Sequence, residues 1–150
     1  MDDPNQVRLS AGAVVVREVN GQWRFLLLRA FNHWDFPKGM QESGEAPLDA
    51  ALREVAEETT LRDLEFDWGH DYIETGPYSR GKTARYYLGR TQTFSVTLPV
   101  NPELGRAEHS EFRWVGLEEA YRLARPRVRT VIRWAAGRLG VAGRLPRAGP

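Results

Sequence analysis

The sequence predicts an α/β protein: a single domain in which one mixed β-sheet is packed between helices. The order of the expected elements is the main reason, because strands come first, one helix follows, and further strands and two helices complete the chain. Such an order is typical of a sheet that carries helices on its faces. The length of 150 residues and the hydrophobic content of 41% suit one domain with its own core.

The first two strands are expected at residues 10–17 and 23–29, joined by a tight turn at Asn20-Gly21. A loop over residues 32–44 follows. The second half is expected to contain more strands and two helices, because β-branched and aromatic runs alternate with helical patterns that Pro126 interrupts. These strands fall within residues 64–73, 83–94 and 112–115, and the helices at 117–124 and 128–139.

A helix is expected from Pro47 to Glu58. Proline fits the first helical position, where its missing N–H costs nothing. The residues that follow are mostly Ala, Leu, Arg and Glu, which favour helices. Four residues recur at helical spacing and predict a buried stripe: Leu48, Leu52, Val55 and Thr59.

The domain is expected to span residues 1–140, followed by a flexible tail at 141–150 that is rich in Gly, Pro and Arg. After Glu119 the chain has eight Arg and no acidic residue, so its net charge of +1 is unevenly distributed. This basic stretch is compatible with binding of polyphosphate or RNA, and equally with a solvated helix and tail.

Composition excludes several classes of protein. The chain has no cysteine, so it has no disulfide framework, thiolate metal site or cysteine nucleophile. There is no apolar run of 18 residues, and the first ten residues are polar and acidic. We therefore expect neither a membrane anchor nor a signal peptide, and a cytoplasmic location.

Three carboxylates on the predicted helix indicate a possible metal site. Glu54, Glu57 and Glu58 stand at i, i+3 and i+4 and so share one face. Like charges this close repel one another, and a hard divalent cation with oxygen ligands would compensate. Such a charge run is usually a solvated helix face, but the residues around this one argue against that interpretation.

Residues 39–61 resemble the Nudix box, G-x5-E-x7-R-E-U-x-E-E-x-G-U, in which U is a bulky aliphatic residue. Thr60 is the one departure, because the family has a glycine there that closes the helix in a left-handed conformation. With a β-branched residue, either the cap geometry differs or about 1 kcal/mol of strain is tolerated. The resemblance implies an α/β/α sandwich and a metal-dependent hydrolase of nucleoside diphosphates linked to another group. The matching positions are Gly39, Glu45, Arg53, Glu54, Glu57 and Glu58.

Within this family, the flanking sequence resembles the asymmetric diadenosine tetraphosphate hydrolases. This implies hydrolysis of diadenosine tetraphosphate to ATP and AMP, with Mg²⁺, or Mn²⁺ in its place, as cofactor. The resemblance is carried by FLLLRA, HWDFPKG, KTARYYL and EHSEFRWVGLEEA, at residues 25–30, 33–39, 82–88 and 108–120.

The resemblance also implies the catalytic roles. The metal would be bound by Glu54, Glu57 and Glu58, joined by Glu108 and the carbonyl of Lys38. Activation of the attacking water would fall to Glu54, with Glu57 or Glu108 as alternatives. Arg53 would pair with Glu45 and brace the loop against the helix, and Gly39 would be structural.

The substrate-binding roles follow from the same resemblance. Lys38 and Lys82 would hold phosphates, and His33 would contact the phosphate chain or protonate the leaving group. Tyr78 or Tyr86 would offer an aromatic surface to adenine. An aromatic residue expected after the LEEA helix is missing, and Arg125 and Arg127 stand in its neighbourhood. His109 is expected to be structural.

Three other functions stay open at the level of sequence. The WDFPKG segment resembles bacterial RNA pyrophosphohydrolases, and the basic C-terminal stretch favours an RNA 5′ end as substrate. The same basic residues suit diphosphoinositol polyphosphates. A non-catalytic nucleotide-binding module of the same fold is supported by Thr60 alone. The sequence does not predict the oligomeric state.

Overall fold

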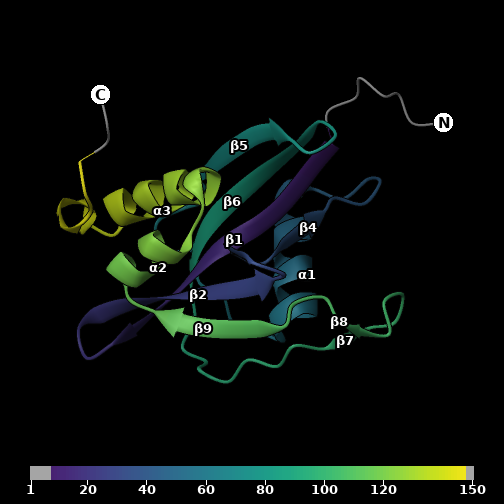
Figure 1. Cartoon of the computed structure of the whole chain (residues 1–150), viewed down its shortest axis with the longest axis horizontal. Helices are drawn as coiled ribbons and strands as arrows, with labels where there is room; N and C mark the ends of the chain where they lie inside the picture. The colour runs from purple at the N-terminus through teal and green to yellow at the C-terminus, as the bar shows by residue number, and fades with distance from the viewer. Residues whose placement is uncertain (1–7, 148–150) are drawn as a thin grey trace.

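The computed structural model describes residues 8–147 (Figure 1). Its centre is a seven-stranded sheet with the order β3-β2-β1-β6-β5, in which β4 also pairs with β1, and β9 with β2. β1 and β6 run parallel, while the other neighbours are antiparallel, so the sheet is mixed. The strands are β1 (Arg8–Val19), β2 (Gln22–Ala30), β3 (His33–Asp35), β4 (Lys38–Met40), β5 (Tyr72–Tyr78), β6 (Lys82–Arg90) and β9 (Glu111–Val115), with a separate hairpin of β7 (Val100–Asn101) and β8 (Arg106–Ala107).

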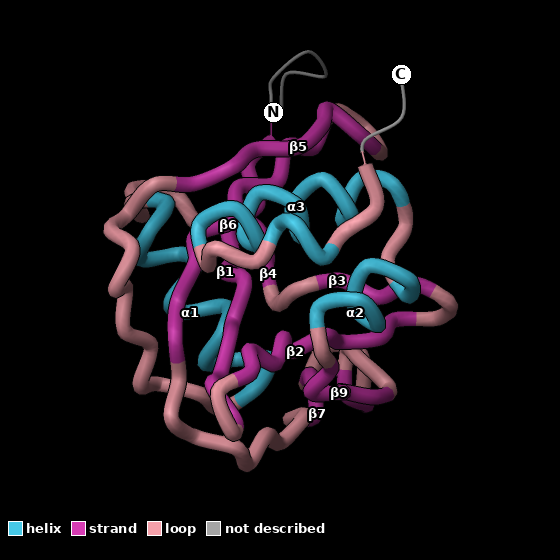
Figure 2. The backbone as a smooth tube through the Cα atoms, turned by 90° about the vertical axis from the view of Figure 1, so that its left-hand side faces the viewer, coloured by secondary structure: helices cyan, strands magenta, loops and turns pink. Residues whose placement is uncertain are grey.

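The central strand β1 is buried on both faces. Val14 and Val16 belong to the core cluster that contains Ile132 of α3 (Pro126–Arg138). Val15 belongs to the cluster that contains Val55 of α1 (Pro47–Thr59). Because successive side chains of a strand point to opposite faces, α1 and α3 cover opposite sides of the sheet, as Figure 2 shows. With α2 (Leu117–Leu123) beside α3, the predicted α/β/α sandwich is confirmed.

The helix α1 begins at Pro47 as predicted, but one residue of its expected buried stripe is wrong. Leu52 is 38% exposed, and the buried face consists of other residues. At the C-terminal end, Thr60 adopts the left-handed conformation with φ of 68°, and its N–H donates to the carbonyl of Ala56. The helix therefore ends in the usual left-handed cap, and the strain of a β-branched residue at positive φ is tolerated. The buried residues are Ala50, Ala51, Val55, Glu58 and Thr59.

The strand expected at 83–94 ends at Arg90. The hydroxyls of Thr91 and Thr93 donate to the carboxylate of Asp63, at 2.5 and 2.9 Å, and this contact replaces further pairing within the sheet. Residues 64–73 contain an isolated bridge at Glu65 and the start of β5 at Tyr72. The third helix starts at Pro126, which occupies the first turn instead of interrupting the pattern.

The first part of the tail expected from residue 141 makes contacts with the rest of the domain. The N–H of Val141 donates to the carbonyl of Ala136, and Arg133 donates to the carbonyl of Pro146 at 2.7 Å. Leu145 is buried in the core under α3. The last three predicted tail positions, 148–150, lie outside the described residues, as do 1–7. No helix between residues 8 and 147 is long and apolar enough to cross a membrane.

Candidate active site

Arg53 of α1 lies at the centre of a hydrogen-bond network that joins the helix to the preceding loop. Its Nε and Nη2 donate to the two carboxylate oxygens of Glu45, at 2.8 and 3.0 Å. Nη2 also donates to the carbonyl of Met40 at 3.0 Å. Nη1 donates to Glu54 at 2.9 Å and to Glu57 at 3.2 Å. The predicted pairing of Arg53 with Glu45 is thus present, in the two-point geometry that a guanidinium favours.

Gly39 allows the helix to approach the sheet closely. A Cβ at this position would collide with the carboxylate of Glu54. The requirement for glycine therefore comes from the close approach of the Glu54 carboxylate to the backbone of β4, and a larger residue would displace this side chain.

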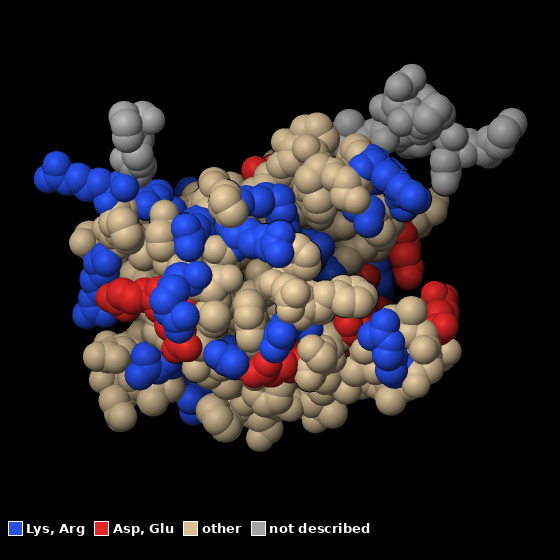
Figure 3. Space-filling model, viewed as in Figure 1, with Lys and Arg blue, Asp and Glu red and all other residues tan. Residues whose placement is uncertain are grey.

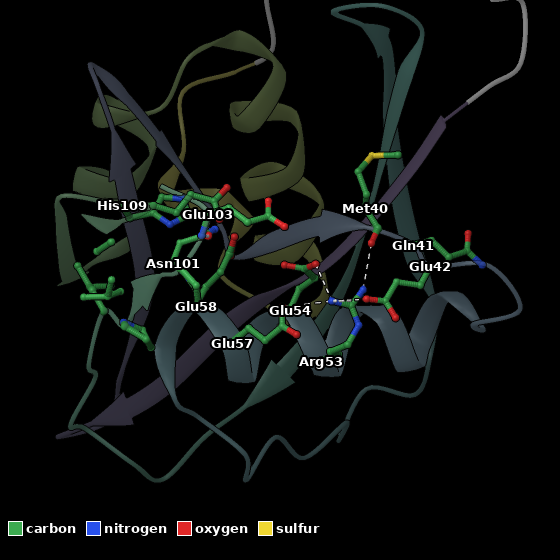
Figure 4. Close-up of a pocket in the computed structure, with 16 residues that line it drawn as sticks. Met40, Gln41, Glu42, Arg53, Glu54, Glu57, Glu58, Asn101, Glu103 and His109 are labelled. Carbon is green, nitrogen blue, oxygen red and sulfur yellow. Dashed lines mark hydrogen bonds and ion pairs between the residues drawn. The ribbon is translucent and has the colours of Figure 1, made fainter. Parts of the chain in front are cut away.

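The carboxylates of α1 line a cavity of about 730 Å³ between this helix, β4 and the β7–β8 hairpin (Figure 4). Of the predicted metal ligands, Glu54, Glu57, Glu58 and Glu108 all line it. The side chain of Glu58 is held by the backbone N–H of Lys38, which donates to it at 3.0 Å. Residues far apart in the sequence are thereby brought to one site.

Burial and mutual repulsion shift the protonation of these groups. Burial raises the pKa of Glu58 well above its usual range, and the neighbouring charges of Glu108 and Glu54 add to this effect. Burial likewise raises the pKa of Glu54, against the opposing hydrogen bond from Arg53. Hydrogen bonds from Arg53 lower the pKa of Glu45 to about 2. The site thus holds negative charge that its own residues compensate incompletely.

A divalent cation fits this donor set by its chemistry. Carboxylate oxygens are the ligands that Mg²⁺ and Ca²⁺ prefer, and a cation would stabilise the crowded charges of Glu54 and Glu58. Within residues 8–147, no three His, Cys, Asp or Glu side chains already form a group that could hold an ion. Arg53 occupies oxygens of Glu54 and Glu57 instead, so an ion would compete with the guanidinium for them.

The comparison with known families identifies this arrangement. Residues 7–135 match the model of the NUDIX domain. The chain belongs to the Nudix family. Members of this family generally use divalent metal ions, which agrees with the chemistry of the carboxylate site.

Among Nudix proteins, the chain is similar to tetraphosphatases in sequence and structure. It is 34% identical to the asymmetrical bis(5′-nucleosyl)-tetraphosphatase of Mus musculus over 111 residues, which cover 70% of this chain and 72% of the relative. A crystal structure of a C. elegans Ap4A hydrolase binary complex superposes with a TM-score of 0.72 at 27% identity, covering 89% of this chain and 98% of the other. An RNA pyrophosphohydrolase of Bartonella bacilliformis is 32% identical over 57% of this chain and 58% of its own length.

The predicted substrate-binding residues of this Nudix domain lie outside the walls of the cavity. His33 is exposed beside the β2–β3 turn, and Lys82 begins β6. The ammonium of Lys38 lies 6.0 Å from the centroid of the Tyr78 ring. Tyr86 is fully buried, so a base cannot reach its ring, and its predicted role as an adenine surface is wrong.

The sequence did not reveal a polar network formed by Asp35, Tyr86 and Arg127. The hydroxyl of Tyr86 donates to Asp35 at 2.8 Å, and Arg127 donates to Asp35 at 2.5 Å and to Tyr86 at 2.9 Å. These contacts join β3, β6 and the start of α3. Asp35, Tyr86 and Arg127 are far apart in the sequence, so no local pattern could have indicated the network.

His109 was expected to be structural, and the structure places it in the wall of the cavity beside Glu108. Burial lowers its pKa, so the imidazole is neutral at pH 7. Its position next to Glu108, which was itself assigned to the metal site, was the available signal.

Proposed function

We propose that the protein hydrolyses diadenosine tetraphosphate to ATP and AMP, with Mg²⁺ as its cofactor. The observation that carries this proposal is the convergence of the α1 carboxylates on one cavity, braced by Arg53. The similarity to named tetraphosphatases supports the choice of substrate. The dimensions of the cavity, about 730 Å³, are those of a small-molecule site.

The charge of the cavity supports a requirement for metal. Its lining contains one arginine against six carboxylates, so an anionic polyphosphate chain would be repelled in the absence of cations. Divalent ions between the carboxylates and the phosphates would turn repulsion into attraction. The carboxylates are Glu42, Glu54, Glu57, Glu58, Glu103 and Glu108.

The roles proposed for the side chains follow from this chemistry. When bound, the metal lowers the pKa of the attacking water and neutralises phosphate oxygens. Glu54 is the residue proposed to accept the proton of that water, because its carboxylate lines the cavity beside the other proposed ligands. Glu57 and Glu108 are the alternatives. Lys38, Lys82 and His33 lie outside the walls of the cavity, so their roles rest on the resemblance to the tetraphosphate hydrolases. The two lysines would stabilise the charge of the departing nucleotide, and His33 would contact the phosphate chain or protonate the leaving group.

Chromatographic analysis of the products tests the proposal. Diadenosine tetraphosphate incubated with the protein and Mg²⁺ should give equal amounts of ATP and AMP, and a chelator should abolish their formation. Glu57→Gln should remove most of the activity and leave the melting temperature close to that of the parent. Turnover near the parental rate in this variant would show that the catalytic site lies elsewhere.

The second candidate substrate is the 5′ triphosphate end of RNA. The similarity to an RNA pyrophosphohydrolase favours it, as do the basic side chains that Figure 3 shows across the face where α2 and α3 lie. Release of pyrophosphate from 5′-triphosphorylated RNA, at a rate above that for diadenosine tetraphosphate, would establish it. Failure on both substrates would direct attention to diphosphoinositol polyphosphates. Nucleotide binding without any turnover would indicate a non-catalytic module.

A further inference from the structure

The two tyrosines expected to receive a nucleobase are both occupied. Tyr86 is fully buried. The guanidinium of Arg127 lies 4.5 Å from the centroid of the Tyr78 ring, and Lys38 lies 6.0 Å from it. A base could stack on Tyr78 only by competing with these cations. An aromatic ring without such cations would bind a base without this competition.

Phe31 is the most exposed large hydrophobic side chain in the described part of the protein, at 80%. Two other aromatic rings are also exposed, but cations cover them: Arg85 lies 3.9 Å from the ring centroid of Tyr72, and Arg17 lies 5.4 Å from that of Phe94. Within residues 8–147, no cation or second ring is stacked against Phe31. Its ring is thus free for a ligand.

The backbone at Phe31 is unfavourable for this residue. Phe31 and Asn32 form a two-residue turn between β2 and β3, in which Ala30 pairs with His33. Phe31 has φ of +56°, a conformation in which such turns usually place glycine. Strained backbone conformations of this kind cluster at functional sites.

Arg29 fixes the turn and thereby the direction of the ring. Its Nε donates to the carbonyl of Phe31 at 2.8 Å, and its Nη2 donates to the side-chain oxygen of Asn32 at 3.3 Å. Its Nη1 pairs with Glu111 of β9 at 3.3 Å. The turn is consequently held against β9, and the ring is presented from a fixed support.

The turn follows directly on the part of β2 that pairs with the start of β9. Arg29 pairs with Glu111, and the N–H of Ser110 donates to the carbonyl of Arg29 at 2.8 Å. Ser110 directly follows His109, which lines the cavity, so the end of β2 that carries the turn lies against a segment leading into the cavity wall. Figure 1 shows the end of β2 and the start of β9 on the side of the molecule that carries the β7–β8 hairpin.

We propose that Phe31 is the stacking platform for a nucleobase of the substrate, and so a determinant of specificity. This inference rests on the proposed function, since it assigns a binding site to the nucleobase at one end of a substrate whose phosphates occupy the cavity. A flat, uncharged ring attracts purines more strongly than pyrimidines, because stacking increases with the area of the base. The enzyme should therefore prefer diadenosine to diuridine tetraphosphate.

Steady-state kinetics on these two substrates test the platform. Phe31→Gly should raise KM for diadenosine tetraphosphate about tenfold, leave kcat within about twofold, and bring the two substrates close to equal kcat/KM. Phe31→Tyr should retain the preference for purine. Phe94→Ala removes an exposed ring at another position and should leave all of these values unchanged. Phe31→Gly should melt at or above the temperature of the parent, because glycine suits a positive φ.

Unchanged KM and purine preference in Phe31→Gly would overturn the inference. A lower melting temperature together with a lost kcat would also overturn it, because the residue would then be structural. If the parent protein does not hydrolyse diadenosine tetraphosphate, the proposed function fails by itself. The platform is then tested by titration of ATP with Mg²⁺, where equal dissociation constants for the parent and Phe31→Gly would refute it, and about tenfold weaker binding would support it.

Discussion

Single residues hold the carboxylate-lined cavity in shape, and Arg53 is the clearest case. All three of its nitrogens donate, and their acceptors belong to the β4 backbone, to the loop before α1 and to α1 itself. A lysine would keep the charge but has no planar fork with which to bind several acceptors at once. The geometry of the donors is therefore as important as their charge.

Arg53→Lys should reduce the rate of hydrolysis about 10- to 100-fold, because residues that orient ligands have effects of this size. It should also lower the free energy of unfolding by about 1–3 kcal/mol, since partly buried acceptors on Glu45 and Glu54 lose their donors. Urea denaturation and initial rates measure the two effects. Wild-type values for both would show that the network is dispensable.

Gly39→Ala should reduce activity more than tenfold, because the added Cβ meets the carboxylate of Glu54 and displaces it. Gly137→Ala provides the matched control, since a Cβ at that position meets no atom within 4 Å. Initial rates and melting temperatures of both variants separate the local collision from a general effect of alanine. Full activity in Gly39→Ala would mean that hydrolysis does not require the Glu54 carboxylate to lie against β4.

Among the elements, α1 supplies three of the six carboxylates that line the cavity and ends in a strained residue. Thr60 adopts φ of 68° to close the helix. Thr60→Gly should therefore stabilise the protein by about 1 kcal/mol, which corresponds to a rise of about 2–4 °C in the melting temperature. Activity should not change, because Thr60 supplies no ligand. Calorimetry measures the shift, and a lower melting temperature would show that the threonine side chain makes a stabilising contact.

The sequence predicted elements well where a local pattern determines them. The start of α1 at Pro47 and the shared face of its carboxylates follow from helical spacing alone. The prediction of strand boundaries failed where contacts with residues far away in the sequence determine the structure. Thr91 and Thr93 favour a strand by propensity, but their hydroxyls bind Asp63, about thirty residues away.

Predictions for the site were limited in the same way. Tyr86 was expected to offer a surface to adenine, but both it and its neighbour Tyr87 are buried, because β6 lies inside the sheet with α1 on one face and α3 on the other. Leu145 belongs to a segment whose composition predicts disorder, yet it packs against α3. Each error arose from a contact with a segment remote in the sequence.

At the scale of the whole molecule, the carboxylates of the site determine how stability depends on pH. The pKa of Glu45 is lowered to about 2 in the folded protein, so its contribution is present above pH 4.5 and is lost as the pH falls toward 2. The pKa values of Glu54 and Glu58 are raised, so their contributions are present below pH 4.5 and are lost as the pH rises through the raised values.

In the presence of a chelator, the melting temperature should therefore rise from pH 2 to about 4.5 and decline toward neutral pH. Glu58→Gln should reduce the decline, because the amide keeps an acceptor for the Lys38 N–H without the buried charge. Addition of Mg²⁺ at neutral pH should raise the melting temperature of the parent, since an ion that binds the folded state stabilises it. Thermal scans over pH test this, and a flat profile with no response to Mg²⁺ would contradict it.

The parallel pairing of β1 with β6 has a consequence for the synthesis of the chain on the ribosome. One edge of β1 can pair with β2 and β4 as soon as residue 40 has emerged, but the other edge needs residues 82–90. At a translation rate of about 5–20 residues per second, this edge stays open for several seconds. An unpaired strand with the sequence AVVV is prone to association with other chains during that interval. The nascent protein is thus most vulnerable to aggregation before its central strand acquires its second neighbour.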